Sequence, residues 1–406
     1  MLDSLITPPI APPLDLDAPA VQPPSAQEML CLEALNRIDG VGQQTLFALL
    51  KKAGHPQALW EANEDFLRAH LSDKKREAFE RVRDAGLNPL WLENMQQSGV
   101  SLLACTHPQY SRLLGEIHQA PAFLYVRGNL AALNGKTVAV VGTRQASEYG
   151  RQVTRHLIDG LKPANVTIVS GLAAGIDTEA HWAALRNGLP TVAVFGCGLD
   201  VIFPVVNRRL SEEIVAQGGA LVSEYSMGMS PTKYTFPQRN RIVAGLSHGL
   251  LVVEGDLKSG ALITARLALE EGRTVFAVPG NIFNPGSQGT TALLRSGAVP
   301  VAVADDLLKE LQWWLHEPPA EQLSMLPEDV STPTSAMSPR LRIPEGLSPD
   351  ESQVLQAIGY DPVSVDDLQQ TTGLPSAKIS ASLTLLELDG LIVLLPGAKV
   401  CRKSIC

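Results

Sequence analysis

The segment from Lys233 to Arg241 reads Lys-Tyr-Thr-Phe-Pro-Gln-Arg-Asn-Arg, and it gathers three cations, two aromatic rings and two amides. Cations neutralise phosphates, a ring stacks on a base, and amides reach base edges or the backbone, so this is the chemistry of a strand-binding groove. Pro237 breaks regular structure, and we expect it to hold Phe236 in an extended loop, with a helix beginning near Arg239. The alternative is ordinary structure, in which Phe236 belongs to a core and the arginines pair with carboxylates.

Three further loops carry glycine or hydroxyl residues between an apolar run and a helical pattern. Glycines let backbone N–H groups approach an anion closely, and the helix dipole adds to the attraction. Several such loops along one edge suit a polyanion. None of them is a GxGxxG sequence, so a dinucleotide site is only weakly indicated, and any one loop also has an ordinary turn explanation. With the first segment, they give these candidate contacts: Arg144, Ser147, Ser170, Gly171, Lys233, Phe236, Arg239, Asn240, Arg241, Ser259, Gly260 and Thr264.

The sequence predicts no catalytic, metal or cofactor site. Asp177 and His181 are four residues apart on one helical face, which more often gives a local hydrogen bond than a metal site. Glu224 and Glu254 fall at strand ends, where a catalytic carboxylate could lie. Their simpler role is to pair with the loop arginines and orient them.

Five nearly continuous apolar runs precede or follow these loops, and segments of helical length separate them. Such runs are typical of a parallel sheet that is buried on both faces. We therefore expect a doubly wound α/β domain over residues 100–315, with its ligand site beyond the carboxyl ends of the strands. The runs are Thr137–Val141, Val166–Val169, Thr191–Phe195, Leu250–Val253 and Thr274–Val278.

The amino-terminal quarter differs from this domain in composition and in its pattern of apolar residues. Residues 1–26 are rich in proline and poor in large apolar side chains, which predicts a disordered tail. Residues 27–99 predict a small helical domain of the SAM-like or helix-hairpin kind, with a glycine turn at Ile38–Gly42. In some DNA-binding modules such a turn faces a phosphate, but the mixed, acidic character of the next helices favours a plain helical bundle.

The carboxyl-terminal part begins with a segment rich in Pro, Ser, Thr and Glu, which predicts a flexible linker over residues 316–345. Three short helical patterns and a hairpin follow, so residues 346–406 are predicted to form a winged helix. Its third helix carries only Lys378 as a cation before Glu387 and Asp389. Contact with a protein is therefore favoured over direct reading of duplex DNA.

Composition limits where nucleic acid can bind. With a net charge of −9 over 406 residues, the chain cannot coat nucleic acid through its whole surface, so any such site must be local. The five cysteines include no CxxC pair, which suits a reducing compartment. The sequence has no apolar run of about 18 residues and no basic leader, so we expect a cytoplasmic protein without a membrane span.

Taken in order, the motifs resemble the signature series of the bacterial DNA-processing protein A family, also called Smf. The resemblance covers residues 105 to 303, and the longest block is highly specific. Tyr110 and Pro121–Tyr125 are similar to the entry segment of the family. The matching blocks are Gly142–Arg144 with Ser147 and Tyr149–Gly150, Ser170–Asp177 with Ala180–His181, Phe236–Ser247, Ser259–Ala265 and Val278–Asn281.

The resemblance implies an extended Rossmann-like domain in a homodimer that binds single-stranded DNA. It further implies that the protein protects incoming DNA and helps to load the RecA recombinase during natural transformation. By the same resemblance, Arg144, Lys233 and Phe236 contact the strand. The chain departs from the family at Ala174, where arginine is usual, and at Gly255, where alanine is frequent. The missing cation should weaken one phosphate contact.

Two other functions stay open at this point. The same fold family contains phosphoribohydrolases, enzymes that cleave nucleotides and use a PGGxGTxxE loop. The corresponding stretch here, Ser259–Ala265, lacks the double glycine and the glutamate. The winged domain also leaves open a regulator that binds duplex DNA.

Overall fold

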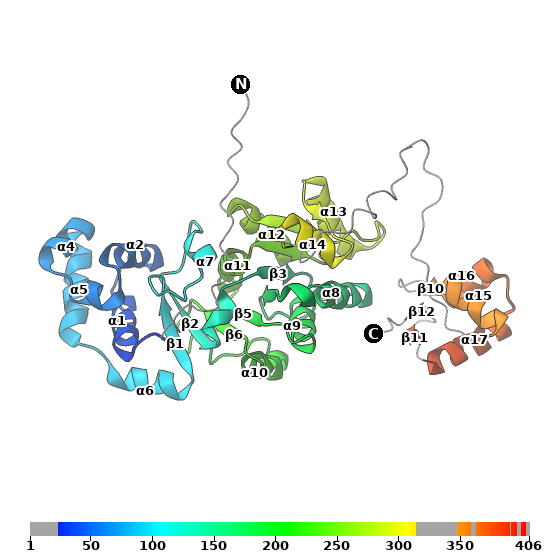
Figure 1. The fold of residues 1–406 in the computed structure, drawn as a ribbon, viewed down its shortest axis with the longest axis horizontal. Helices are drawn as coiled ribbons and strands as arrows, with labels where there is room; N and C mark the ends of the chain where they lie inside the picture. Colours follow the sequence, from blue (N-terminus) through cyan, green and yellow to red (C-terminus); the bar gives the residue numbers. More distant parts are fainter. Residues whose placement is uncertain (1–22, 314–346, 359–362, 390, 396–398, 403–406) are drawn as a thin grey trace, which may run out of the picture. The chain divides into compact units, whose positions relative to one another are not determined.

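The computed structural model describes residues 23–313, 347–358, 363–389, 391–395 and 399–402. The chain divides into two compact units, Met1–Leu315 and His316–Cys406 (Figure 1). The linker predicted over 316–345, and all but the last four residues of the tail predicted over 1–26, lie outside the described residues.

The first unit begins with a module of six helices. Ser25 caps the first helix in a reciprocal capping box with Glu28, which satisfies two backbone N–H groups at the helix start. Leu50 and Phe79 are fully buried, and they belong to the same apolar cluster as the first strand of the sheet. The helices therefore share a core with the sheet. They are α1 (Ala26–Asn36), α2 (Gln43–Ala53), α3 (Pro56–Trp60), α4 (Glu64–His70), α5 (Asp73–Ala85) and α6 (Pro89–Gln97).

A nine-stranded sheet forms the centre of this unit, in the order β1-β2-β6-β5-β4-β3-β7-β8-β9. The seven strands from β6 to β9 in this order run parallel, whereas β2 is antiparallel to both β1 and β6. The strands are β1 (Val100–Ala104), β2 (Phe123–Gly128), β3 (Thr137–Val141), β4 (Thr167–Ser170), β5 (Thr191–Phe195), β6 (Ala220–Ser223), β7 (Gly249–Val252), β8 (Thr274–Ala277) and β9 (Val299–Pro300).

The predicted fold class is confirmed: the unit is an α/β domain with a doubly wound, mostly parallel sheet. The five apolar runs correspond to β3, β4, β5, β7 and β8, with ends that agree within one residue. The five predicted runs do not include β1, β2, β6 and β9. A strand at β6 was implied only by the placement of Glu224 at a strand end, and β9, with two residues, is too short to give the apolar run of a buried strand.

Helices cover both faces of the sheet, because successive strand side chains point to opposite sides. Val138 and Val140 of β3 pack with α8 (Glu148–Gly160), α9 (Ile176–Arg186) and α14 (Ala304–Glu310). Ala139 and Val141 face the cluster that contains α11 (Thr235–Gly245) and α12 (Gly260–Glu270). The remaining helices of this unit are α7 (Arg112–Gly115), α10 (Arg208–Ala216) and α13 (Gln288–Arg295).

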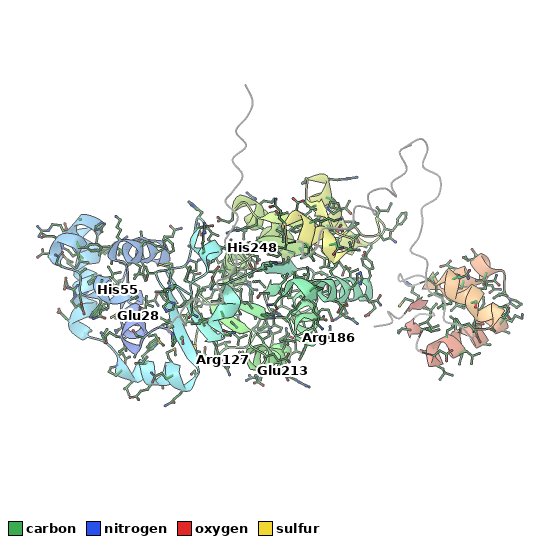
Figure 2. All side chains as sticks on the ribbon, viewed as in Figure 1. Glu28, His55, Arg127, Arg186, Glu213 and His248 are labelled. Atoms are coloured by element: carbon green, nitrogen blue, oxygen red, sulfur yellow. The ribbon has the colours of Figure 1, made fainter. Side chains whose placement is uncertain are left out.

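His248, labelled in Figure 2, ties the end of the first unit to its sheet. Its Nδ1 lies 3.0 Å from Oγ1 of Thr137 on the neighbouring strand. The ring also makes an edge contact with Trp313, at 5.0 Å between ring centroids.

The second unit has the helices and strands of a winged helix, as predicted. Helices α15 (Pro349–Ala357), α16 (Val365–Thr372) and α17 (Ser376–Leu388) accompany a sheet in the order β10-β12-β11. Its strands are β10 (Val363–Ser364), β11 (Ile392–Leu395) and β12 (Lys399–Arg402). Lys378 of α17 forms an ion pair with Asp350 at 2.8 Å, so its charge is partly neutralised within the unit. Within the described parts of both units, no helix has the length and apolar character needed to span a membrane.

Candidate nucleic-acid interface

The largest group of predicted site residues meets at the carboxyl edge of the sheet, where the strand order reverses between β3 and β7. Ligands of doubly wound proteins bind at such switch points. A cleft of about 590 Å³ lies there, and we call it the edge cleft. Of the predicted contacts, Arg144, Gly171, Lys233, Phe236, Arg239, Asn240, Ser259, Gly260 and Thr264 line it. Ser147, Ser170 and Arg241 do not.

Helix α11 supplies one wall of the edge cleft. Phe236 and Asn240, one turn apart, line the cleft together with Lys233, which precedes the helix. The expectation of an extended loop at Phe236 was wrong, because α11 begins at Thr235 and already includes Phe236 and Pro237. Proline is tolerated in the first turn of a helix, since the N–H groups there have no intrahelical partner to lose.

A cation and a ring contact each other across the cleft. The Arg144 guanidinium lies 5.7 Å from the centroid of the Phe236 ring. The Phe203 ring is a further neighbour of Phe236, with 5.5 Å between the two ring centroids. Arg144 is exposed and Phe236 half-buried, so both can meet a strand laid in the cleft, the cation on a phosphate and the ring on a base.

Two exposed lysines add positive charge, while one carboxylate opposes it. Lys233 and Lys258 both line the cleft, as does the exposed Asp256. Asp256 accepts a hydrogen bond from the Lys258 backbone N–H at 2.8 Å, which fixes the loop. With Arg144, the exposed charges of the lining sum to a net positive value, which favours a polyanion.

Sequence reasoning assigned no contact to Lys258, Asp256, Thr143 or Ile263, although Thr143 and Ile263 lie in the blocks that resemble the family. A lysine directly before a helix-capping serine, at the end of a predicted strand, was the available signal for Lys258.

The start of α12 also opens onto the cleft. Ser259 caps it, with its Oγ accepting from the Ala261 N–H at 3.3 Å. Gly260 is exposed, and a Cβ added there would have nothing within 4 Å, so a ligand can approach the backbone closely. Thr264 is buried and donates to the Gly260 carbonyl at 3.2 Å, which supports the turn. First-turn N–H groups with the helix dipole behind them attract an anion.

The other two loops hold carboxylates of the protein itself at the amides that we expected to face phosphate. The Gly171 and Ala173 N–H groups donate to Oδ2 of Asp177, at 3.1 and 3.4 Å. The Ser147 N–H donates to Oε2 of the buried Glu254 at 2.9 Å, while its Oγ caps α8 by accepting from Gly150. These amides are therefore occupied. The expectation that the Gly171 N–H is open to phosphate was wrong, because Asp177 accepts its hydrogen bond.

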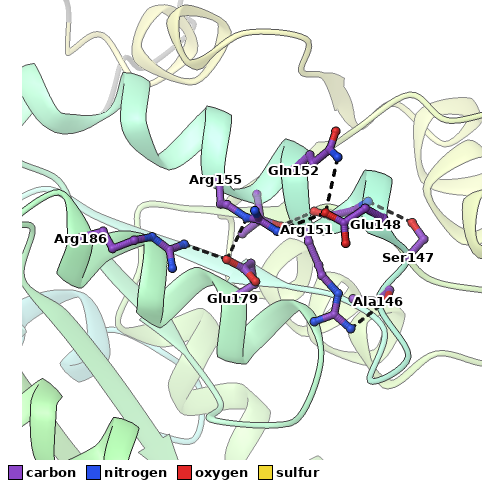
Figure 3. A network of polar contacts seen from close by, with 10 residues as sticks. Ala146, Ser147, Glu148, Arg151, Gln152, Arg155, Glu179 and Arg186 are labelled. Atoms are coloured by element: carbon purple, nitrogen blue, oxygen red, sulfur yellow. Dashed lines mark hydrogen bonds and ion pairs between the residues drawn. The ribbon is translucent and has the colours of Figure 1, made fainter. Parts of the chain in front are cut away.

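A network of ion pairs holds the beginning of α8 against α9 (Figure 3). Glu179 of α9 binds Arg155 at 3.1 Å and Arg186 at 2.8 Å. Arg155 also reaches Glu148 at 3.4 Å, and Arg151 donates to the Ala146 carbonyl at 3.3 Å. The network fixes the helix that follows the Arg144 loop.

Arg239 serves the interior of the protein. It is only 4% exposed, and its Nη1 donates to the Gly171 carbonyl at 2.7 Å and to the Val194 carbonyl. Burial lowers the pKa of Arg239 to about 10, and the nearby Asp177 opposes that change. Burial likewise raises the pKa of Asp177, against the effect of the positive Arg239. This arginine joins the ends of β4 and β5 and forms the floor of the cleft.

Ser170 and Arg241 also have partners inside the protein. Ser170 is buried and donates to the Val140 carbonyl at 2.7 Å. Arg241 forms a largely buried ion pair with Glu224. This is the pairing of a loop arginine with a strand-end carboxylate that the sequence analysis gave as the simpler role of Glu224. The expected local bond between Asp177 and His181 was wrong: His181 instead bonds Oγ1 of Thr191 through Nδ1, at 2.7 Å. The described residues contain no group of three potential metal ligands.

A doubly wound sheet with a cationic, aromatic cleft at its switch point defines an α/β protein whose cleft has the charge and shape to suit a polyanion. The chain belongs to the DprA/Smf family. Residues 101–312 match the family described as DNA recombination-mediator protein A, and residues 338–398 match the DprA winged helix domain. The resemblance noted in the sequence is thereby confirmed.

Individual relatives agree with this assignment. Protein Smf of Escherichia coli (strain K12) is 40% identical over 316 residues, which are 78% of this chain and 80% of that protein. DNA processing protein DprA of Streptococcus pneumoniae (strain ATCC BAA-255 / R6) is 46% identical over 200 residues, 49% of this chain and 70% of that protein. The X-ray structure of DprA from Streptococcus pneumoniae matches with a TM-score of 0.60 at 35% identity, covering 71% of this chain and 99% of that one.

Proposed function

We propose that this protein binds single-stranded DNA in the edge cleft and does so without catalysing a reaction on it. The strand lies over the carboxyl edge of the sheet, with Arg144 and Lys233 on phosphates and Phe236 stacked on a base. The α12 terminus at Ser259 and Gly260 receives a further phosphate. The observation that carries this proposal is the contact between the exposed Arg144 guanidinium and the Phe236 ring, 5.7 Å apart in the lining of the cleft.

The chemistry of the lining favours a single strand over a duplex. A stacking ring needs an unpaired base, whereas a duplex hides its base faces. Asp177 and Glu254 are buried carboxylates near the cleft that accept backbone N–H bonds, and the exposed Asp256 of the lining accepts the Lys258 N–H. They are engaged as structural acceptors, which supports a binding protein over a nucleotide-cleaving enzyme.

The family description, that of a recombination mediator, supports a proposal for the role in the cell. We propose that the protein works as a homodimer in the cytoplasm, where it protects incoming single-stranded DNA and loads the RecA recombinase onto it during natural transformation.

Titration of a labelled oligonucleotide at several salt concentrations tests the binding. Each phosphate neutralised adds about 0.7 to the slope of log affinity against log salt for a single strand. Lys233→Ala should therefore weaken binding and reduce that slope by about 0.7. Lys162→Ala, which changes an exposed lysine after α8 that is outside the edge cleft, is the matched control.

If Lys233→Ala binds as tightly as the native protein, with an unchanged salt slope, the assignment of the cleft is wrong. Release of free base from nucleoside monophosphates would likewise overturn the proposal of a protein that only binds. Stronger binding of duplex than of single strands would exclude a single-strand function.

A further inference from the structure

The first turns of helix α11 form a ridge between two clefts. Phe236 and Asn240 face the edge cleft, whereas Gln238 and Arg241 line a second cleft on the other flank. Pro237 lines both. A chain that leaves the edge cleft over Pro237 therefore enters the second cleft directly. We call this second hollow the ridge cleft.

The ridge cleft has a volume of about 660 Å³, within the range of about 300–1,000 Å³ that ligand pockets occupy. The helical module forms one side of it, and the carboxyl edge of the sheet forms the other. The module contributes Asn36 and the residues from Gly42 to Thr45, at the start of α2. The opposite side includes Gln119, Tyr225, Met229 and Gln238.

Apart from the Ser226 hydroxyl, its exposed polar side chains are neutral carboxamides. The side chains of Gln44 and Gln119 are exposed and have no hydrogen-bond partner among the described residues. Gln238 is exposed too, and its Oε1 accepts from the Tyr225 hydroxyl at 3.3 Å, which leaves its NH₂ group to donate elsewhere. Three carboxamides that offer both donors and acceptors converge on this cleft.

The charge of the cleft argues against a phosphate. Among the described residues that line it, Arg241 is the one cation, and Glu224 neutralises it in a largely buried ion pair. A carboxamide carries no net charge, but it pairs with the donor and acceptor pattern on the edge of a nucleobase. The ligand chemistry that fits is therefore an unpaired base.

We propose that the ridge cleft is a second nucleotide subsite, which takes an unstacked base of the strand whose backbone is held in the edge cleft. This inference rests on the proposed function and extends it, because it assigns the helical module a direct part in holding DNA. Gln44 and Gln119 contact the base edge from the module and the neighbouring loop, and Gln238 contacts it from the ridge.

The double variant Gln44→Ala/Gln119→Ala tests the subsite, because both side chains are exposed and their loss removes no internal bond. Binding is measured by fluorescence anisotropy with oligothymidylates of increasing length, and with strands that carry one abasic position moved along the sequence. Each base contact removed should lower affinity by a factor of about 5 or more. Gln97→Ala, an exposed glutamine at the end of α6 outside both clefts, is the matched control.

We expect the double variant to bind the shortest strands like the native protein and to lose about fivefold affinity for longer ones, with an unchanged salt slope. In the native protein, an abasic nucleotide at the position that enters the ridge cleft should also weaken binding by about fivefold. The same abasic strand and the intact strand should bind the double variant equally well.

Equal binding of native protein and variant at every length, with the same response to each abasic position, would overturn the ridge subsite while leaving the edge cleft in place. A reduced salt slope in the variant would also overturn it, because the ligand would then be a phosphate. If the native protein binds no strand of any length, both the subsite and the proposed function are wrong.

Discussion

The buried carboxylate of Glu254 accepts a hydrogen bond from the backbone N–H of Ser147, with 2.9 Å between Oε2 and N. The carbonyl of the same glutamate accepts the Thr143 N–H at 2.7 Å. One residue at the end of β7 thus holds both ends of the loop that carries Arg144. An internal anion occupies the start of α8, so the proposed binding mode places a phosphate at the terminus of α12 instead.

Replacement of Glu254 by alanine should loosen that loop. The Ser147 N–H would lose its acceptor, and a buried unsatisfied N–H reduces the free energy of unfolding by about 1–3 kcal/mol. Urea denaturation measures this loss. Glu254→Gln keeps an acceptor oxygen and should lose less, while Glu212→Ala, which removes an exposed carboxylate of α10, is the control. Equal stability of the alanine and glutamine variants would contradict the role given to this bond.

Arg144→Lys separates charge from stacking at the edge cleft. Lysine keeps the positive charge but lacks the planar guanidinium that lies 5.7 Å from the Phe236 ring. We expect the affinity for single strands to fall by a factor of about 3–10 while the salt slope stays that of the native protein. Arg144→Ala should lower both. A lysine variant that binds like the native protein would show that the ring contact contributes nothing to binding.

The stability of the sheet should depend on pH through His181. Burial, followed by the charge of Arg239, lowers the pKa of His181 to about 3, from an ordinary value of 6.5. Below pH 6.5, His181 therefore binds a proton in the unfolded chain but not in the folded protein. The free energy of unfolding falls as the pH drops from 6.5 towards 3.

Between pH 7.5 and pH 5, this group should reduce the free energy of unfolding by about 2 kcal/mol. Urea midpoints at the two pH values measure the change. In His181→Gln most of it should disappear. The remainder reports other groups such as His248, whose pKa burial also lowers. An undiminished pH dependence in that variant would rule out His181 as the source.

Much of the site followed from the order of strand, loop and helix. That order placed Arg144 and Ser259 at one edge, because the carboxyl ends of parallel strands meet there. The burial of Arg239 could not be predicted from its own segment. Its acceptors are the carbonyls of Gly171 and Val194, which lie 68 and 45 residues earlier in the chain.

The same limit applies to the amides of the glycine-rich loops. Asp177 lies close in sequence to the Gly171 N–H that it binds, so a carboxylate in the first turn of α9 was a local signal. Glu254 is 107 residues from Ser147, and only the parallel pairing of β3 with β7 brings the two together. Local sequence patterns indicate which amides lie at the edge, whereas the tertiary fold decides which of them stay open.

Gly175→Ala tests whether the close packing beneath Arg144 matters for binding. Gly175 has φ of +84°, and a Cβ there would lie 2.2 Å from the Thr143 carbonyl oxygen and 2.7 Å from the Arg144 carbonyl. The methyl group must therefore displace the Arg144 loop.

Gly188→Ala is the control, since φ is +67° but nothing lies within 4 Å of its Cβ position. Both variants carry the strain of positive φ, about 1 kcal/mol. We expect only Gly175→Ala to lose more stability than this in urea denaturation, and also to bind single strands about tenfold more weakly, because the displaced guanidinium no longer reaches the strand. Similar losses in the two variants would mean that this packing does not position Arg144.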